Sequence, residues 1–222
     1  MENGFQKERE QFKKMQGTVE SCPFRTRYHI MPPVGWLNDP NGLCQFHGVY
    51  HAYFQYSPLN VHGGGGFWGH CISRDLLHWE YKEPVLTTDI PEDESGVYSG
   101  SALIEDDRMY IFYTGNVKKP GDYDYIDAGR ISTQILTESE DGQHMSQKVK
   151  LLGMEDYPGD MTQHIRDPKV WKENGKYFMV LGARKRAWDP DGKRNDKGGV
   201  LIYESSDKRN WRLYQEYVPE KK

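Results

Sequence analysis

The sequence predicts an all-β fold of the β-propeller type, with three repeated units within 222 residues. Two repeats support this prediction. The first is a short strand, a polar or glycine-containing turn and a tyrosine-led strand, which is the pattern of a β-hairpin. It occurs at residues 41–54, 101–113 and 168–180. The second is a Ser-x-Asp-x-x-x-Trp or Ser-x-Asp-x-x-x-Met box, which follows each hairpin.

The Ser-x-Asp box recurs at a fixed period. It spans residues 73–79, 139–145 and 205–211, so its copies start 66 residues apart. A regular period of this kind, with about four strands per unit, is typical of propeller blades. We expect each box to form the turn between the last two strands of a blade, with its final Trp or Met packed between blades. Because the box occurs once per unit, we assign it to folding and not to catalysis.

The chain divides into a short extension and the repeated units. Residues 1–24 are predicted to form a helical N-terminal extension, since residues 5–16 are polar with a few apolar positions on one side. Residues 25–222 are predicted to form a partial β-propeller. Propellers typically close with about four to eight blades. Three units are therefore expected to be part of a longer propeller or a truncated product.

Composition argues against several classes of function. The formal net charge is -4, and there is no basic patch for nucleic acid. No run of about 18 apolar residues predicts a membrane span, and the N-terminus has no apolar signal segment. The three cysteines (Cys22, Cys44, Cys71) lack metal-ligand spacing and are odd in number. We therefore expect reduced thiols, no metal, no cofactor and a cytoplasmic protein; the oligomeric state is not determined.

The stretch Gly-Trp-Leu-Asn-Asp-Pro-Asn-Gly at residues 35–42 leads into the first unit. Asn and Asp tolerate left-handed backbone, Pro fixes φ and Gly accepts positive φ, so these residues predict a rigid turn. Such a turn would aim the carboxylate of Asp39 from the mouth of the following strand. The alternative is an ordinary turn that only starts the strand.

A similar segment, Arg166-Asp167-Pro168, leads into the third unit. The first strand of a propeller unit lies nearest the central axis, and the turn before it points into the central funnel. We therefore expect Asp39 and Asp167 at equivalent positions of units one and three, facing one cavity. Two such carboxylates with an Arg and aromatic residues indicate glycoside chemistry, in which one attacks an anomeric carbon and the other holds sugar hydroxyls. Arg166 would keep a neighbouring carboxylate ionised by lowering its pKa.

The run His-Ile-Met-Pro-Pro-Val-Gly-Trp-Leu-Asn-Asp-Pro-Asn-Gly at residues 29–42 resembles the β-fructosidase motif of glycoside hydrolase family 32. That family includes invertases, sucrose-6-phosphate hydrolases, inulinases and levanases. The resemblance covers nearly all of residues 25–217. It continues through the motifs at residues 53–58, 67–79, 98–101 and 166–170. It implies a five-bladed propeller followed by a β-sandwich, of which this chain would carry blades one to three without the C-terminal blades and the sandwich.

The resemblance also implies an activity, the retaining hydrolysis of β-fructofuranosides such as sucrose or sucrose 6-phosphate. It makes Asp39 the nucleophile that forms a fructosyl-enzyme intermediate. It makes Asp167 the transition-state stabiliser, with Arg166 beside it. The partner would be a small fructoside, oriented by amides and hydroxyls, with an indole stacked on its apolar face. The residues implied to bind it are Asn38, Gln55, Trp68, Tyr98 and Ser99.

One element of the family pattern is absent from this chain. The general acid/base of the family is a Glu in a Glu-Cys-Pro motif, and the sequence has no Glu-Cys dipeptide. Two alternatives therefore stay open beside hydrolysis. The chain could be an inactive remnant or a sugar-binding module without that acid, or the enzyme could transfer fructose to another sugar. A propeller that serves only as a protein-interaction platform does not explain two Asp-Pro segments with an Arg.

Overall fold

The computed structural model describes residues 6–26, 28–58, 60 and 66–219. Within these residues it has one α-helix, α1 (Gln6–Glu20), and three antiparallel sheets of four strands each. Blade one contains β1 (Trp36–Phe46), β2 (Val49–Ser57), β3 (Phe67–Ser73) and β4 (Trp79–Thr87). Blade two contains β5 (Val97–Glu105), β6 (Arg108–Lys118), β7 (Arg130–Ser139) and β8 (Val149–Leu152). Blade three contains β9 (Met161–Glu173), β10 (Lys176–Lys185), β11 (Lys197–Ser205) and β12 (Arg212–Tyr217).

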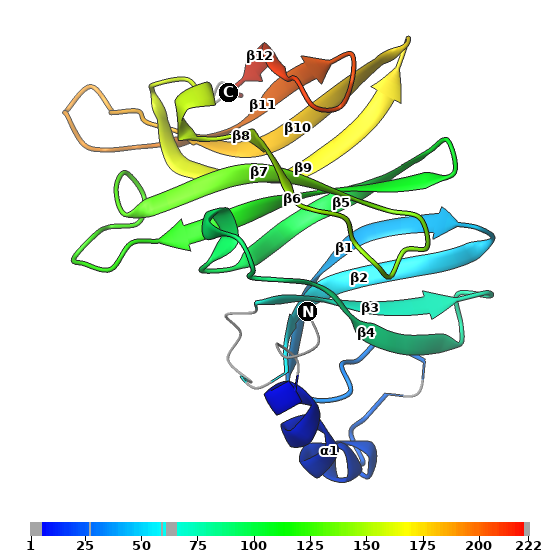
Figure 1. Cartoon of the computed structure of the whole chain (residues 1–222). Helices are drawn as coiled ribbons and strands as arrows, with labels where there is room; N and C mark the ends of the chain where they lie inside the picture. The colour runs from blue at the N-terminus through cyan, green and yellow to red at the C-terminus, as the bar shows by residue number, and fades with distance from the viewer. Residues whose placement is uncertain (1–5, 27, 59, 61–65, 220–222) are drawn as a thin grey trace.

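The three sheets are stacked face to face as successive blades (Figure 1). Each is a simple meander in chain order, and short 3₁₀ helices lie at Pro91–Asp93, between β4 and β5, and at Met154–Asp156, between β8 and β9. The first strands of the blades lie together, since β5 contacts both β1 and β9. The prediction of an all-β, propeller-type fold with three blades is confirmed. The number of blades in a complete ring, and the division at residue 24, stay predictions.

The first two strands of each blade form the predicted hairpins. Each is closed by two residues with positive φ, as a type I′ turn requires. This turn has the backbone twist that matches the right-handed twist of paired strands. The turn residues are His47-Gly48 (φ 49° and 74°), Asp106-Asp107 (50° and 58°) and Asn174-Gly175 (49° and 79°).

The Ser-x-Asp box forms the same turn in all three blades. In blade two the Ser139 hydroxyl accepts from the backbone N–H of Gly142 at 2.8 Å and donates to Asp141 Oδ1 at 3.1 Å. The same Oδ1 accepts from the N–H groups of Gln143 and His144, both at 2.8 Å. Equivalent bonds occur at residues 73–78 and 205–210. The assignment of the box to folding is therefore supported by its geometry.

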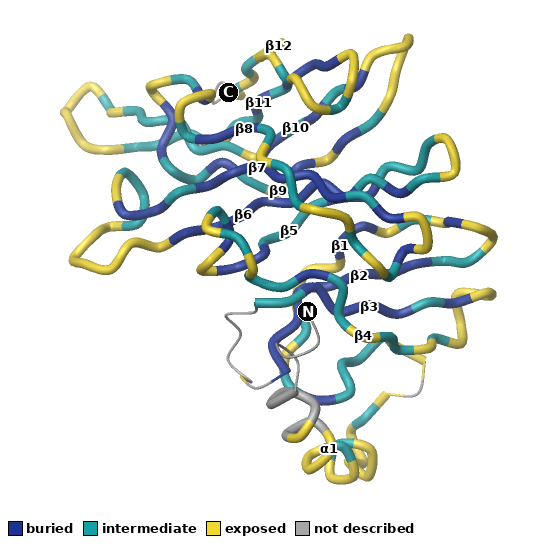
Figure 2. Tube along the Cα trace, viewed as in Figure 1, coloured by how far each residue is buried: buried dark blue, intermediate teal, exposed yellow. Residues whose placement is uncertain are grey.

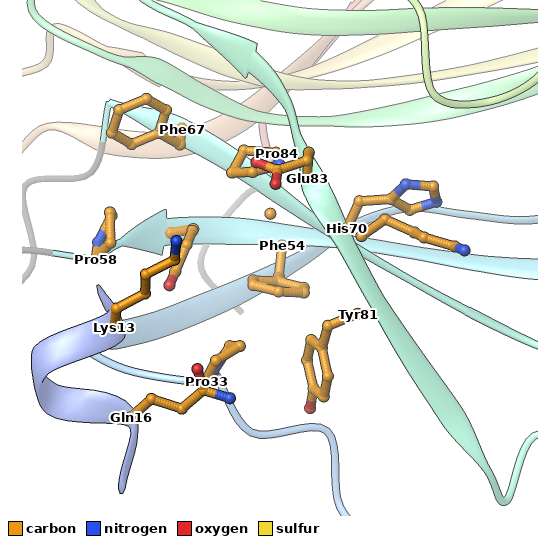
Figure 3. A pocket seen from close by; sticks show the side chains of 13 residues that line it. Lys13, Gln16, Pro33, Phe54, Pro58, Phe67, His70, Tyr81, Glu83 and Pro84 are labelled. Atoms are coloured by element: carbon orange, nitrogen blue, oxygen red, sulfur yellow. The ribbon is translucent and has the colours of Figure 1, made fainter. Parts of the chain in front are cut away.

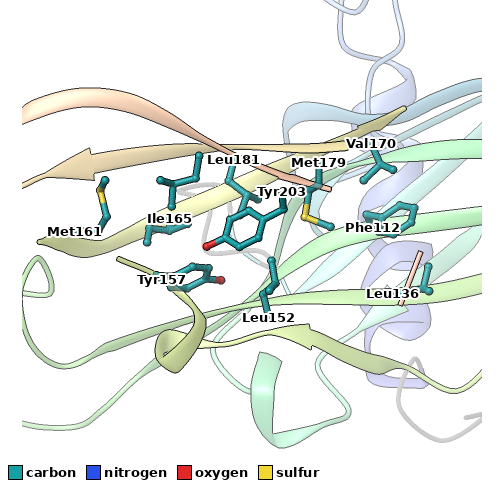
Figure 4. Close-up of a cluster of buried hydrophobic side chains, with 11 residues drawn as sticks. Phe112, Leu136, Leu152, Tyr157, Met161, Ile165, Val170, Met179, Leu181 and Tyr203 are labelled. Atoms are coloured by element: carbon teal, nitrogen blue, oxygen red, sulfur yellow. The ribbon is translucent and has the colours of Figure 1, made fainter. Parts of the chain in front are cut away.

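The hydrophobic core lies between neighbouring blades, where Figure 2 shows the strands mostly buried. Between blades two and three, Phe112 and Leu136 pack with Met179, Leu201 and other side chains (Figure 4). Trp211, the last residue of the third box, meets Phe112 edge-on at 6.2 Å between ring centroids. Met145, at the same position of the second box, packs on the core between blades one and two. The predicted inter-blade packing of the box is thus confirmed for these two residues.

The segment before β1 lies over the face of blade one that is turned away from blade two. The backbone N–H of Met31 donates to the Tyr81 hydroxyl at 2.8 Å. Lys13 and Gln16 of α1, together with Pro33 and Phe54, line a cavity of about 660 Å³ (Figure 3). The first five residues of the predicted extension lie outside the described residues. Within the described residues, no helix is long and apolar enough to cross a bilayer.

Blades one and two enclose a pair of histidines that are neutral in the folded protein. His51 Nδ1 lies 3.0 Å from His70 Nε2, so only one of these nitrogens carries a proton. The Tyr53 ring stacks on His70, and its hydroxyl donates to the Gly142 carbonyl of blade two at 2.7 Å. Burial lowers the pKa of His70 to about 4, although a hydrogen bond to Gln143 opposes the shift. Burial also lowers the pKa of His51.

The histidine pair predicts a pH-dependent stability. His70 is neutral in the folded chain down to about pH 4, whereas an unfolded histidine takes up a proton near pH 6.5. The free energy of unfolding is therefore highest above pH 6.5 and falls as the pH decreases toward 4. The loss is on the order of 3 kcal/mol. Urea unfolding at several pH values should show this slope, and His70→Asn should reduce it. The exposed His29→Asn is the control, and an unchanged slope in the His70 variant would contradict the assignment.

Candidate active site

The first strand of each blade has a one-residue bulge at the same place in its pairing. In β1, Leu37 pairs with Tyr56 and Pro40 pairs with Phe54, so three steps along β1 face two steps along β2. The same count holds for β5 against β6 and for β9 against β10. Bulges of this kind leave residues out of the regular ladder and redirect their side chains. The bulged residues are Asn38-Asp39 in β1, Tyr98-Ser99 in β5 and Asp167-Pro168 in β9.

The bulges correct two sequence-based predictions. Asp39 does not lie in a turn before the first strand, because residues 36–46 pair with β2 and the Asn-Asp-Pro-Asn-Gly run is an irregular part of that strand. Asp39 and Asp167 are also not at equivalent positions. Asp39 is the second bulged residue of β1, whereas Asp167 is the first bulged residue of β9. The residue of β1 at the position equivalent to Asp167 is therefore Asn38.

Five of the six bulged residues, all except Pro168, line one cavity of about 440 Å³, within the usual size range of a small-molecule site. Seven of the eight site residues predicted from the sequence line it. Two further residues, Ser95 and Lys118, line it as well. The complete lining is Asn38, Asp39, Gln55, Ser95, Tyr98, Ser99, Lys118, Arg166 and Asp167.

Trp68 is the predicted site residue that does not line the cavity. It is completely buried in the core between blades one and two. Its indole N–H donates to the Tyr98 carbonyl at 3.0 Å. The prediction that Trp68 stacks on a sugar is therefore wrong. Its role in this structure is to hold the bulged segment of β5 from beneath.

Asp39 is oriented by the neighbouring bulge. The Ser99 hydroxyl donates to Asp39 Oδ2 at 2.7 Å. The next residue, Gly100, has no room for a side chain, since a Cβ there would lie 1.9 Å from the Phe112 carbonyl oxygen. This close approach fixes the backbone of β5 beside the bulge. Any larger residue at position 100 would push β5 away from the Phe112 carbonyl and displace Ser99, which holds Asp39.

Side chains just after the bulges connect the three first strands. The Gly100 N–H of β5 donates to Oδ1 of the buried Asn41 of β1 at 3.4 Å. The Ser101 hydroxyl of β5 donates to the Pro168 carbonyl of β9 at 2.8 Å, and accepts from the Val170 N–H at 3.2 Å. The three bulges are thus held in one register across the blades.

Gln55 is fixed in the cavity wall by its amide. Its Nε2–H donates to the Val97 carbonyl at 2.9 Å, across from β2 to β5. Asn38 is oriented by the Trp36 indole, whose N–H donates to Asn38 Oδ1 at 3.1 Å. Both amides therefore have defined orientations, and each can exchange hydrogen bonds with a sugar hydroxyl.

Asp167 is held in a strained backbone conformation. Its φ is 63°, which is uncommon for a residue with a side chain and is frequent near functional sites. Its N–H donates to the Thr114 hydroxyl at 3.1 Å, and that hydroxyl donates to Gln134 at 2.8 Å. Thr114 and Gln134 are completely buried supports that the sequence motifs did not indicate. The sequence did contain one signal for them, since both are polar residues in the middle of strands, β6 and β7.

The two carboxylates influence each other through the cavity. Loss of solvation raises the pKa of Asp167, and the negative charge of Asp39 raises it further. Arg166 opposes both effects, with its Nε 3.8 Å from Asp167 Oδ2. The expected effect of Arg166 on the neighbouring carboxylate therefore has the predicted direction. Among the described residues, no cluster of His, Cys, Asp or Glu could hold a metal ion.

The fold and the cavity define a propeller-type chain in which the first strands of three blades bring two carboxylates, an arginine, amides and hydroxyls to one site. Residues 29–222 match the family described as "Glycosyl hydrolases family 32 N-terminal domain". The chain therefore belongs to glycoside hydrolase family 32, as the sequence motifs predicted.

Individual relatives agree with this assignment. The chain is 38% identical over 204 residues to a sucrose-6-phosphate hydrolase of Bacillus subtilis (strain 168), which covers 92% of this chain and 39% of that protein. The solved sucrose-6-phosphate hydrolase from Lactobacillus gasseri has a TM-score of 0.78 at 32% identity, over 94% of this chain and 40% of that one. A mutant of a Bombyx mori family 32 β-fructofuranosidase in complex with sucrose has a TM-score of 0.73 at 30% identity, over 94% and 41%. The chain thus spans about two fifths of the length of these relatives.

The electrostatics of the cavity predict opposite effects of two substitutions on the pKa of Asp167. Arg166→Met should raise it, because a nearby cation stabilises the ionised form. Asp39→Asn should lower it, because a like charge is removed. Carboxyl NMR titration of ¹³C-labelled Asp measures both. Asp191→Asn, in the exposed loop between β10 and β11, is the control, and shifts of the same sign in the two site variants would contradict the geometry.

Proposed function

We propose that this chain supplies the fructose-binding part of the active site of a retaining β-fructofuranosidase that acts on sucrose or sucrose 6-phosphate. One observation carries the proposal. The bulges of three successive blades bring Asp39, Ser99, Arg166 and Asp167 to the lining of a single cavity. A carboxylate in a sugar-sized site can serve as the nucleophile that retaining glycoside hydrolysis requires. Membership of family 32 and the names of the relatives support the same substrate class.

In the proposed reaction Asp39 is the nucleophile. Its Oδ2 accepts from Ser99, so Oδ1 is the oxygen that attacks the anomeric carbon of the fructosyl group. The bond from that carbon to the leaving-group oxygen breaks as the ester with Asp39 forms. Water then displaces the ester from the face that the leaving group occupied. Two inversions at one carbon give retention of configuration.

Asp167 and Arg166 act on the same fructosyl ring in this proposal. The transition state resembles an oxocarbenium ion and carries positive charge, which an ionised Asp167 stabilises. Arg166 favours the ionised form of Asp167 against the effects of burial and of Asp39. Asn38, Gln55, Tyr98 and Ser99 orient the sugar hydroxyls from the walls.

The general acid is the part that the described cavity does not contain. No glutamate is among the described residues that line it. A positioned acid contributes about 10²–10⁴-fold to such a reaction. This observation favours one alternative, in which the 222 residues by themselves act as a sugar-binding module. The alternative and the proposal differ in whether Asp39 forms a bond to the sugar.

We also infer that the protein works in a reducing compartment, in agreement with the expected cytoplasmic location. All three cysteines are free. Burial raises the pKa of the Cys71 thiol to about 12, and also that of Cys44, where Lys169 opposes the shift. These two thiols are shielded from oxidation in any compartment, so the inference rests on Cys22, which is exposed and free.

A fructosyl donor with a good leaving group tests the nucleophile without requiring the acid. β-D-Fructofuranosyl fluoride should transfer its sugar to the chain, because fluoride departs with little proton donation. Mass spectrometry of peptides should then find one fructosyl group on the peptide that contains Asp39. Asp39→Asn should abolish the label, and Asp191→Asn, at an exposed position outside the cavity, should keep it.

Two results would decide against the proposal. A label that persists in Asp39→Asn would show that Asp39 is not the nucleophile. Saturable binding of sucrose without any covalent label would assign the chain to the sugar-binding alternative.

A further inference from the structure

The cavity lining holds two cations and two carboxylates, and one of the cations has no carboxylate partner in the described structure. Arg166 lies beside Asp167, with its Nε 3.8 Å from Oδ2. The second cation in the lining, Lys118, forms no ion pair with a carboxylate of the described residues. Its ammonium lies 6.0 Å from the centroid of the Tyr125 ring. Lys118 is therefore an exposed cation in the active-site wall with no anion assigned to it.

The position of Lys118 is fixed by the backbone around it. It is the last residue of β6 and pairs with Arg130, the first residue of β7. Its own N–H donates to the Ser95 hydroxyl at 2.9 Å. Ser95 lines the same cavity. A hydroxyl and an ammonium are thus presented together from one side of the site.

A second cation lies behind this wall. Arg130 is 8% exposed. Its Nη1 donates to Asn116 Oδ1 at 2.7 Å and to the Tyr98 hydroxyl at 3.5 Å, and its Nε donates to the Tyr125 carbonyl at 3.1 Å. No carboxylate within the described part of the chain pairs with it. A buried cation that is bonded only to neutral groups makes the adjacent wall electropositive.

This arrangement is suited to an anionic ligand better than to a neutral one. A phosphate monoester carries about −1.5 to −2 charges at neutral pH, and Asp39 and Asp167 would repel it. Lys118 and Arg130 offset that repulsion on one side of the cavity only. A neutral sugar would gain no more than an ordinary hydrogen bond from Lys118, and would leave its charge uncompensated.

We propose that Lys118, together with the Ser95 hydroxyl, binds the phosphate of a phosphorylated β-fructofuranoside and makes this site prefer sucrose 6-phosphate over sucrose. The proposal rests on the proposed function, since it assumes that the fructosyl group occupies the cavity beside Asp39. It identifies Lys118 as a specificity-determining residue. The electropositive wall at Arg130 supports it without contact with the phosphate.

The test compares the affinities of the 222-residue chain for sucrose and for sucrose 6-phosphate by calorimetric titration. The chain should bind sucrose 6-phosphate at least tenfold more tightly, and added salt should reduce this preference. Lys118→Gln should weaken binding of sucrose 6-phosphate about tenfold more than it weakens binding of sucrose. Lys119→Gln is the matched control, because Lys119 is the next residue along the chain and lines a different cavity. Its affinities for both sugars should equal those of the parent.

Each other outcome overturns a distinct part of the assignment. Equal affinity of the parent for the two sugars, or an equal loss for both in Lys118→Gln, would overturn the role of Lys118 alone. Inorganic phosphate bound as tightly as sucrose 6-phosphate would reassign the wall to a free anion. Binding of neither sugar would overturn the proposed function, and the role of Lys118 with it. Unchanged thermal unfolding of Lys118→Gln shows that a loss of affinity is not a loss of fold.

Discussion

The active site depends on a bulge that repeats in the first strand of each blade. A regular strand would alternate its side chains between the two sheet faces, and in every blade at least one of these faces is packed in a core between blades. One extra residue in β1, β5 and β9 releases two residues from this alternation, at the same step of the pairing. The repeat of the fold thus becomes a repeat of positions in the site. Its three copies hold different residues, and the chemistry comes from that difference.

The bulges are kept in place by packing and by hydrogen bonds between blades. Gly100 allows β5 to approach the Phe112 carbonyl, and Asn41 and Ser101 connect β5 to the strands on both sides. Trp68 supports the same segment from the core. Because each of these contacts joins two strands or two blades, the orientation of Asp39 depends on the assembled propeller. The site is a property of the interfaces between blades.

The sequence predicted the fold better than it predicted the site. The period of the Ser-x-Asp box and the three hairpin patterns were sufficient for the blades, because both are local signals that repeat. Seven of the eight predicted residues line the cavity. The bulges were not predicted, since Asn-Asp-Pro-Asn-Gly has the composition of a turn and only pairing with β2 makes it a strand. The burial of Trp68, the support that Thr114 gives to Asp167 and the place of Lys118 in the cavity wall all result from contacts between distant segments. The spacing of motifs along the chain does not reveal such contacts.

The most direct measurement of the central claim is a crystal structure of this chain with bound fructose. The account predicts that the sugar occupies the cavity at the bulges, with its anomeric carbon beside Asp39 Oδ1 and its hydroxyls bonded to Asp167, Asn38 and Gln55. Fructose bound elsewhere, such as in the cavity between α1 and blade one, would contradict it. So would a sugar in the bulge cavity with its anomeric carbon directed away from Asp39.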